Sequence, residues 1–315
     1  MTLLPAFLAV AAGGSTMSVQ AAREIVPHAE TDSVPYVVVL GIAQDGGVPQ
    51  AGGPDRGLER LVVALALVDP VSGQRWLFEA TPDFRSQLQA LDALAPSRDL
   101  APGLDGIFLT HAHMGHYVGL MFLGHESMGA AGVVVYVPPR FAAYLTDNGP
   151  WSQLVSYDNI DVRVQSPGDS VRLNHQLAVT SFRVPHREEF SEVVGYRIDG
   201  PHRRVLFIPD IDGWDDWDRT GVRLEDVLAG VDVAYLDGTF FADGEIPGRD
   251  MSGFPHPRIE ETMDRLQALP AAERAKVRFI HLNHTNPALD PDSPERREIE
   301  SRGFRVADEG ECVGL

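Results

Sequence analysis

The chain has 315 residues, of which 44% are hydrophobic, so it can bury one large core or two smaller ones. Its formal net charge of −19 repels phosphate backbones, and non-specific binding to nucleic acid is therefore not expected. A small anion at a bound metal remains compatible with this charge, because the metal dominates its surroundings. The single cysteine, Cys312, excludes an intrachain disulfide and a cysteine-based zinc site.

The first part of the chain has some features of an export signal. Residues 1–21 carry no charge, and the apolar run Leu3–Ala12 is too short to span a bilayer. Val19-Gln-Ala21 resembles a signal-peptidase site, although a signal peptide normally begins with Lys or Arg. We expect residues 1–33 to be a signal peptide or a disordered tail, with a wrongly assigned start codon as the alternative. The protein would then be periplasmic or secreted, and otherwise cytoplasmic, without a membrane partner.

Short β-branched runs alternate with stretches of helical periodicity along the rest of the chain. The predicted strands are Tyr36–Ile42, Leu61–Val68, Arg75–Glu79, Gly106–Thr110, Val133–Val137, Ile160–Val164, Leu177–Val184, Val193–Ile198, Val205–Ile208, Val233–Leu236 and Val277–Leu282. The predicted helices are Phe84–Leu94, Tyr117–Gly129, Arg140–Asp147, Leu224–Leu228 and Pro257–Leu269. Strands come in runs of two or three before each helix, which favours two sheets between helices over a parallel barrel. No linker divides the chain after residue 34, so residues 34–315 are predicted to form one domain.

The motif His111-Ala-His-Met-Gly-His116 follows an apolar strand that ends at Thr110. His111 and His113 are two residues apart, and in an extended backbone their side chains share a face. His116 falls where a helix is expected to begin. Capping and turn histidines are the alternative, but three imidazoles that converge on one loop can bind a divalent metal.

Three further candidate ligands each follow a predicted strand: His186, Asp210 and His284. Each is a weak signal alone, since an Asp after a strand is often a turn or cap residue. In order along the chain, however, they resemble the signature of the metallo-β-lactamase superfamily. That resemblance implies an αββα sandwich with a metal site, usually of two zinc ions, at the edge of the sheets. It also implies that Asp83 supports the histidine loop from behind.

Within the superfamily, finer features resemble the coenzyme PQQ synthesis protein B family. They are the segments Gly41-Ile-Ala-Gln-Asp-Gly-Gly-Val-Pro-Gln50, Val184-Pro-His-Arg-Glu-Glu-Phe190 and Asn283-His-Thr-Asn-Pro287. Relatives often carry a cysteine cluster after the first of these segments. This chain has Ala51-Gly-Gly-Pro54 there, so a structural zinc of that kind is not expected.

Gly115 stands where the superfamily signature has an Asp that ligates the second metal. One site, formed by His111, His113 and His186, keeps three neutral nitrogens. The other would keep only His116, His284 and a share of Asp210, and should therefore bind its ion weakly. The sequence predicts one or two zinc ions, with iron or manganese as alternatives.

Asp237 and His256 resemble an acid and a histidine of the phosphodiesterase branch of the superfamily. A carboxylate beside an imidazole raises the imidazole's pKa, which suits a general acid that protonates a leaving group. Capping roles for both residues remain the alternative. His281 is expected to be a core or supporting residue rather than a ligand.

These features favour a metal-dependent hydrolase, in which a zinc-bound hydroxide attacks a small ester, lactone, amide or phosphodiester. Asp210, Asp237 and His256 are the expected catalytic residues, and the expected partner is a small-molecule substrate. An oxidative or accessory role in the maturation of a PQQ-like cofactor is the alternative. A degenerate, non-catalytic metal-binding protein is a third possibility, suggested by Gly115.

Overall fold

The computed structural model describes residues 33–54, 56–97 and 102–315. The segment expected to be a signal peptide or tail lies, except for its last residue, outside the described residues. In the described part of the chain, no helix combines the length and apolarity needed to cross a membrane.

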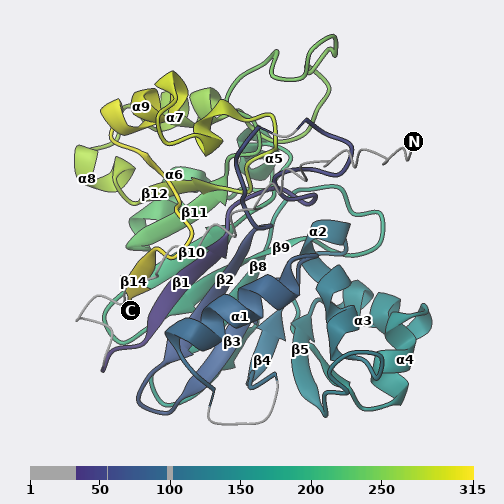
Figure 1. Ribbon diagram of the computed structural model, residues 1–315. Coiled ribbons are helices and arrows are strands. Elements are labelled where there is room, and N and C mark those ends of the chain that lie inside the picture. Colours follow the sequence, from purple (N-terminus) through teal and green to yellow (C-terminus); the bar gives the residue numbers. More distant parts are fainter. Residues whose placement is uncertain (1–32, 55, 98–101) are drawn as a thin grey trace, which may run out of the picture.

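Two mixed β-sheets form the centre of the molecule (Figure 1). The first sheet has the strand order β14-β1-β2-β3-β4-β5-β6, and the second has the order β13-β12-β11-β10-β9-β8-β7. The first sheet consists of β1 (Tyr36–Gly41), β2 (Ala64–Asp69), β3 (Gln74–Phe78), β4 (Gly106–Phe108), β5 (Val133–Val137), β6 (Ile160–Val164) and β14 (Cys312–Gly314). The second consists of β7 (Ser170–Arg172), β8 (Ala178–Arg183), β9 (Val194–Asp199), β10 (Arg204–Ile208), β11 (Val233–Asp237), β12 (Val277–Ile280) and β13 (Arg305–Val306).

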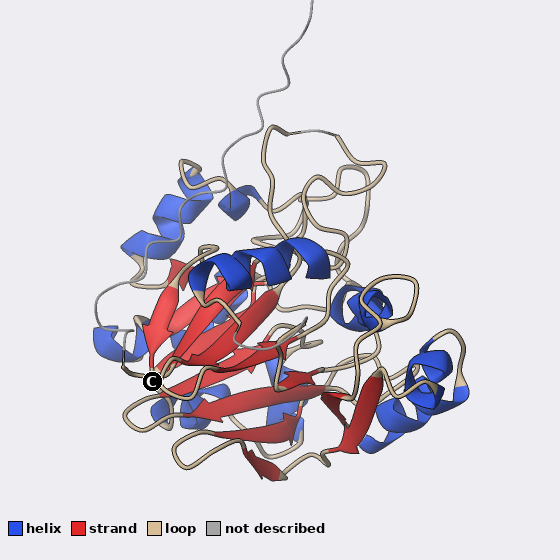
Figure 2. Cartoon of the chain, turned by 60° about the horizontal axis from the view of Figure 1, so that its bottom comes forward, coloured by secondary structure: helices blue, strands red, loops and turns tan. Residues whose placement is uncertain are grey.

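Helices lie outside the two sheets, so that the strands are enclosed between helical layers (Figure 2). The first sheet packs against α1 (Phe84–Leu94), the 3-10 helix η2 (Val118–Leu123), α3 (Pro139–Asp147) and α4 (Trp151–Ser156). The second packs against α5 (Trp214–Arg219), α6 (Leu224–Ala229), α7 (Ile259–Leu266) and α9 (Pro294–Ser301). The remaining short helices are α2 (Met114–Tyr117), α8 (Ala271–Arg274) and η3 (Pro287–Leu289).

Strand β1 shows why the central strands are apolar along their whole length. Val37 and Val39 face the layer between the sheets, whereas Val38 and Leu40 face the layer under the helices. Both faces are buried, and a strand buried on both faces loses the usual alternation of polar and apolar residues. Burying each such side chain contributes roughly 1.5–3 kcal/mol to stability.

The αββα sandwich expected from the sequence is confirmed, and every strand predicted from the sequence is present. The helix predicted over Tyr117–Gly129 is wrong: the chain forms α2 and then η2, which ends before Gly124. The N–H of Gly119 donates to the carbonyl of Ala80, and the carbonyl of His116 accepts from the N–H of Ala80, so neither group is free for a continuous α-helix. Strands β7, β13 and β14 and helices α4, α5, α8 and α9 were not predicted, since each is short or largely polar.

Parallel pairing brings the candidate residues to one edge of the sandwich. Strands β3 to β6 pair in parallel, and so do β10 to β13. Their carboxyl ends therefore point the same way within each sheet, and polar side chains that follow the strands gather at that end.

Candidate metal centre

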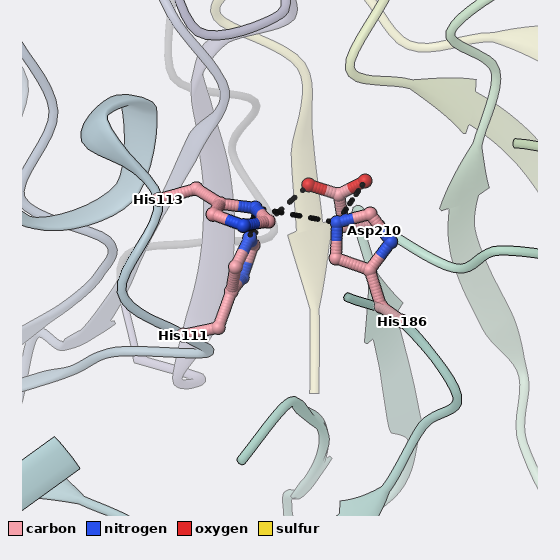
Figure 3. Close-up of side chains that lie close together, drawn as sticks. All are labelled: His111, His113, His186 and Asp210. Carbon is pink, nitrogen blue, oxygen red and sulfur yellow. Dashed lines mark hydrogen bonds and ion pairs between the residues drawn. The ribbon is translucent and has the colours of Figure 1, made fainter. Parts of the chain in front are cut away.

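The first group of candidate ligands consists of His111, His113, His186 and Asp210, whose ligand atoms all lie within 4.8 Å of one another (Figure 3). Nε2 of His111 lies 2.8 Å from Nδ1 of His113, which is 3.3 Å from Nε2 of His186. The two histidines of the motif follow β4, and the other two residues follow β8 and β10. The group thus joins the two sheets.

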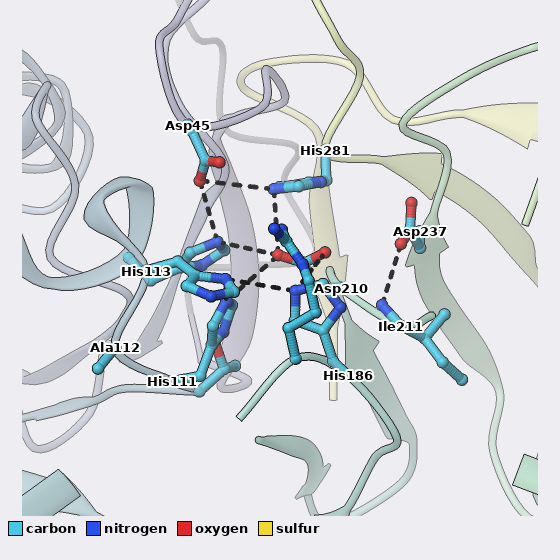
Figure 4. A network of polar contacts seen from close by, with 12 residues as sticks. Asp45, His111, Ala112, His113, His186, Asp210, Ile211, Asp237 and His281 are labelled. Carbon is cyan, nitrogen blue, oxygen red and sulfur yellow. Dashed lines mark hydrogen bonds and ion pairs between the residues drawn. The ribbon is translucent and has the colours of Figure 1, made fainter. Parts of the chain in front are cut away.

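A second group consists of Asp45, His116 and His281, again within 4.8 Å of one another. Figure 4 shows Asp45 and His281 of this group beside the histidines of the first group. Asp210 links this group to the first. Its Oδ2 lies 3.3 Å from Nε2 of His111, 3.3 Å from Nε2 of His116 and 3.6 Å from Nε2 of His281. One carboxylate therefore faces imidazoles of both groups.

These spacings fit divalent metal ions. In a tetrahedral zinc site with bonds of about 2.0–2.1 Å, neighbouring ligand atoms are roughly 3.3 Å apart. Moreover, Oδ1 of Asp45, Oδ1 of Asp210 and Nε2 of His116 and His281 are buried without a hydrogen-bond partner in the described part of the chain. Buried polar atoms without partners are costly, and a bound cation would satisfy all of them.

Polar groups orient the imidazoles from behind, as is usual in metal sites. Nδ1 of His186 lies 2.8 Å from Oδ1 of Asp212, and Nε2 of His113 lies 2.9 Å from Oε2 of Glu189. Nδ1 of His281 lies 2.9 Å from Oγ1 of Thr239. In each of these rings, the nitrogen that is not turned toward the cluster is held in place.

Glu79, fully buried at the end of β3, supports the histidine loop. It accepts a hydrogen bond of 2.6 Å from the Thr110 hydroxyl, and its Oε1 lies 3.2 Å from Nδ1 of His116. Asp83 had been expected in this role, and that expectation is wrong. Its carboxylate instead accepts a hydrogen bond from the backbone N–H of Val62, on another loop.

The electrostatics of the site differ between the two groups. Burial and the neighbouring His116 hold the pKa of His111 well below its usual value, so the ring stays neutral and can ligate. Burial opposes the charged form of His116 too, but the carboxylates of Glu79, Asp210 and Asp45 raise its pKa well above normal. Carboxylates that stabilise a proton at this position would equally stabilise a metal cation.

The predicted pair of Asp237 and His256 is brought together beside Asp210. Nδ1 of His256 lies 2.8 Å from Oδ2 of Asp237 and 3.1 Å from Oδ1 of Asp210. Burial lowers the pKa of His256, but these two carboxylates outweigh it and raise the pKa to about 10. His256 has a φ of 81°, a backbone conformation that is costly for a non-glycine residue and often occurs at functional sites. Asp210, His256 and His281 also form a third compact group that could hold a metal.

His284 does not belong to any of these groups, so its expected role as a ligand needs correction. It lies in the turn beyond β12, whereas His281 comes directly after the last residue of that strand and is fully buried. The family signature ends in a histidine, and two histidines of this chain, His281 and His284, lie near that position. The position of His281 at the strand end was the signal that could have corrected the choice.

Among the candidate ligands, Asp45 is the other residue that the sequence does not identify. It lies in the loop after β1, within a segment noted only for its family resemblance. An acid followed by two glycines after a buried strand is common in turns, so the local sequence gave little reason to select it.

The sequence is similar to a known family model and to proteins of known name. Residues 74–310 match the model of the β-lactamase superfamily domain. Coenzyme PQQ synthesis protein B of Methylorubrum extorquens is 27% identical over 311 residues, covering 89% of this chain and 100% of that protein. The protein of the same name from Rhizobium meliloti is 29% identical over 314 residues, covering 89% and 97% respectively.

The fold is also similar to solved structures. The crystal structure of zinc-bound PqqB from Methylobacterium extorquens superposes with a TM-score of 0.72 at 26% identity, covering 89% of this chain and 100% of that one. A diphosphatase of the PhnP family superposes with a TM-score of 0.62 at 19% identity, covering 89% and 97%. At that identity the second likeness supports the fold alone.

Proposed function

The chain belongs to the metallo-β-lactamase superfamily and is similar to PQQ synthesis protein B, and on this premise we propose that it is a metal-dependent hydrolase. The observation that carries the proposal is the convergence of both groups of candidate ligands on the shared carboxylate of Asp210. His111, His113 and His186 would hold one ion, and His116, His281 and Asp210 would face the other. Zinc suits these nitrogen and carboxylate donors, while iron and manganese are chemically possible.

A bound divalent ion supplies a Lewis acid and lowers the pKa of water toward about 7. The chain itself contributes the positioning and the proton. Asp212 and Glu189 hold the rings of His186 and His113 in one orientation. Exact placement of the ligands in this way reduces the reorganisation that catalysis requires.

His256 is the proposed general acid. Its Nδ1 is engaged by Asp237, so Nε2 is the nitrogen that would donate a proton to a leaving group. The raised pKa keeps the ring protonated at neutral pH. Asp237 has no exposed surface and accepts the backbone N–H groups of Ile211 and Thr239, which fixes it in place.

The proposed substrate is a small molecule with an ester, lactone, amide or phosphodiester bond. The net charge of −19 disfavours nucleic acid as a partner. An accessory or oxidative role in cofactor maturation is a second candidate, because the curated relatives are PQQ synthesis proteins. A non-catalytic protein is the weakest candidate, since a decayed site would not need to retain the orienting contacts behind its imidazoles.

The experiment is a metal analysis of the purified protein combined with a panel of chromogenic esters, phosphodiesters, lactones and a β-lactam. We expect zinc and turnover of at least one class, with the activity lost on chelation and restored by zinc. Iron together with oxygen consumption would favour the second candidate. No turnover with a fully loaded protein would overturn the proposal of hydrolysis.

A further inference from the structure

The space beside Gly115 is already filled by another part of the chain. A Cβ on Gly115 would lie 2.1 Å from Oδ1 of Asp45 and 2.6 Å from its Cα. Neither distance is possible for a real side chain. The φ of Gly115 is not in the left-handed region, so the glycine is required by space and not by backbone conformation.

The atom that fills this space is a carboxylate oxygen. Oδ1 of Asp45 lies 3.4 Å from Nε2 of His116 and 4.0 Å from Nε2 of His281. The oxygen is buried and has no hydrogen-bond partner among the residues that the structure describes. Figure 4 shows the side chain of Asp45 directed from its loop toward the imidazoles of the cluster.

Backbone hydrogen bonds fix the Asp45 loop to the loop that carries His281. The N–H of Gln44 donates to the carbonyl of Leu282, and the N–H of Leu282 donates to the carbonyl of Ile42, both at 2.8 Å. Asp45 directly follows Gln44, and His281 directly precedes Leu282, so both candidate ligands are next to residues that form these hydrogen bonds. The relative position of the two side chains is therefore set before any ion binds.

We propose that Asp45 supplies the carboxylate of the second metal position, in place of the acid that Gly115 cannot provide. The inference rests on the proposed metal-dependent function and identifies how its second position is built. The second ion would then have two imidazoles, its own carboxylate and a share of Asp210. The weak second site expected from Gly115 alone assumed that no other carboxylate reaches this position, and the structure contradicts that assumption.

The same geometry reverses an expectation about Gly115. From the sequence, Gly115→Asp should restore a missing ligand. In the structure the new side chain would collide with Asp45, including its Cα, so the substitution should displace the Asp45 loop instead. Gly115→Ala creates the same collision without adding a carboxylate, and we expect both variants to lose the second ion.

The test is the number of Co²⁺ and Zn²⁺ ions bound per chain, measured by titration and by elemental analysis. We expect two ions for the wild type and one for Asp45→Asn, with the affinity of the second ion reduced at least about 100-fold. That estimate takes the upper end of the loss typical for orienting residues as the minimum for a direct ligand. Glu59→Gln is the matched control, because it removes one negative charge at an exposed position outside the ligand groups, and it should keep two ions.

Two tight ions in Asp45→Asn, or only one in the wild type, would overturn the inference. If Asp45→Asn does not fold, Gly115→Ala decides: one ion supports the inference and two overturn it. The measurement is independent of turnover. If Asp45→Asn loses the second ion and the wild type hydrolyses no substrate, the inference holds and the proposed activity does not. If the wild type hydrolyses a substrate and Asp45→Asn keeps two tightly bound ions, the proposed activity holds and the inference does not.

Discussion

The two halves of the metal cluster are built in different ways. His111 and His113 come from one short motif whose spacing indicates that they share a face, and His186 joins them through its match to the superfamily signature. Asp45 and His281 come from loops that follow β1 and β12, and His116 comes from α2, which follows β4. Local spacing and the family signature thus identify the first group, whereas the second, apart from His116, depends on how distant loops pack. Substitutions can separate the two groups experimentally.

The largest effect is expected from changing His111 and His113 together to Ala. The first group then keeps only His186 and the shared Asp210, which is too few donors for a stable zinc site. We expect loss of the first ion and of all hydrolysis, measured by elemental analysis and by the substrate panel. Metal content and activity like those of the wild type would mean that this motif is structural.

His256→Ala examines the residue that contacts the shared carboxylate of Asp210. Loss of a general acid should lower turnover about 10²–10⁴-fold on substrates with poor leaving groups. Nitrophenolate substrates, whose leaving group needs no proton, should be nearly unaffected. An equal loss on both kinds of substrate, or a loss of metal, would instead assign His256 to the third ligand group.

His281→Ala and His284→Ala form a matched pair that tests the second half. Of these two histidines, only His281 faces Asp210 and Asp45. Its loss should therefore lower the affinity of the second ion by at least about 100-fold. His284→Ala should leave two ions bound, because its ring is not in the cluster. Titration with Co²⁺ measures both, and the opposite ranking would restore the assignment made from the sequence.

The smallest effects are expected from the residues behind the first group. Asp212→Ala removes the carboxylate that orients His186 and should lower the affinity of the first ion about 10–100-fold. Glu189→Ala should cost less, since Glu189 is 46% exposed and solvent competes for its contact with His113. Competition with a chromophoric chelator gives both affinities. A greater loss in Glu189→Ala would show that exposure does not set this order.

Much of the fold follows directly from the sequence. Continuous apolar runs such as β1 and β5 have strand length and are rich in Val, and they predict buried strands in a sandwich. Helix α1 has the bounds that its periodicity predicts. The exceptions are short elements, such as α2 and η2, where backbone hydrogen bonds to Ala80 interrupt the helix.

The sequence by itself determined the first half of the candidate centre, because His111 and His113 share a strand-end face and because His186 and Asp210 match the later positions of the superfamily signature. Only the tertiary structure decided the second half. Whether Gly115 means a missing ligand or makes room for one depends on which loop lies against it, and that is a contact between segments far apart in the chain. The choice of His281 over His284 depends likewise on where β12 ends relative to Asp210. Local periodicity describes the neighbours of a residue in sequence, whereas ligand sets are chosen by neighbours in space.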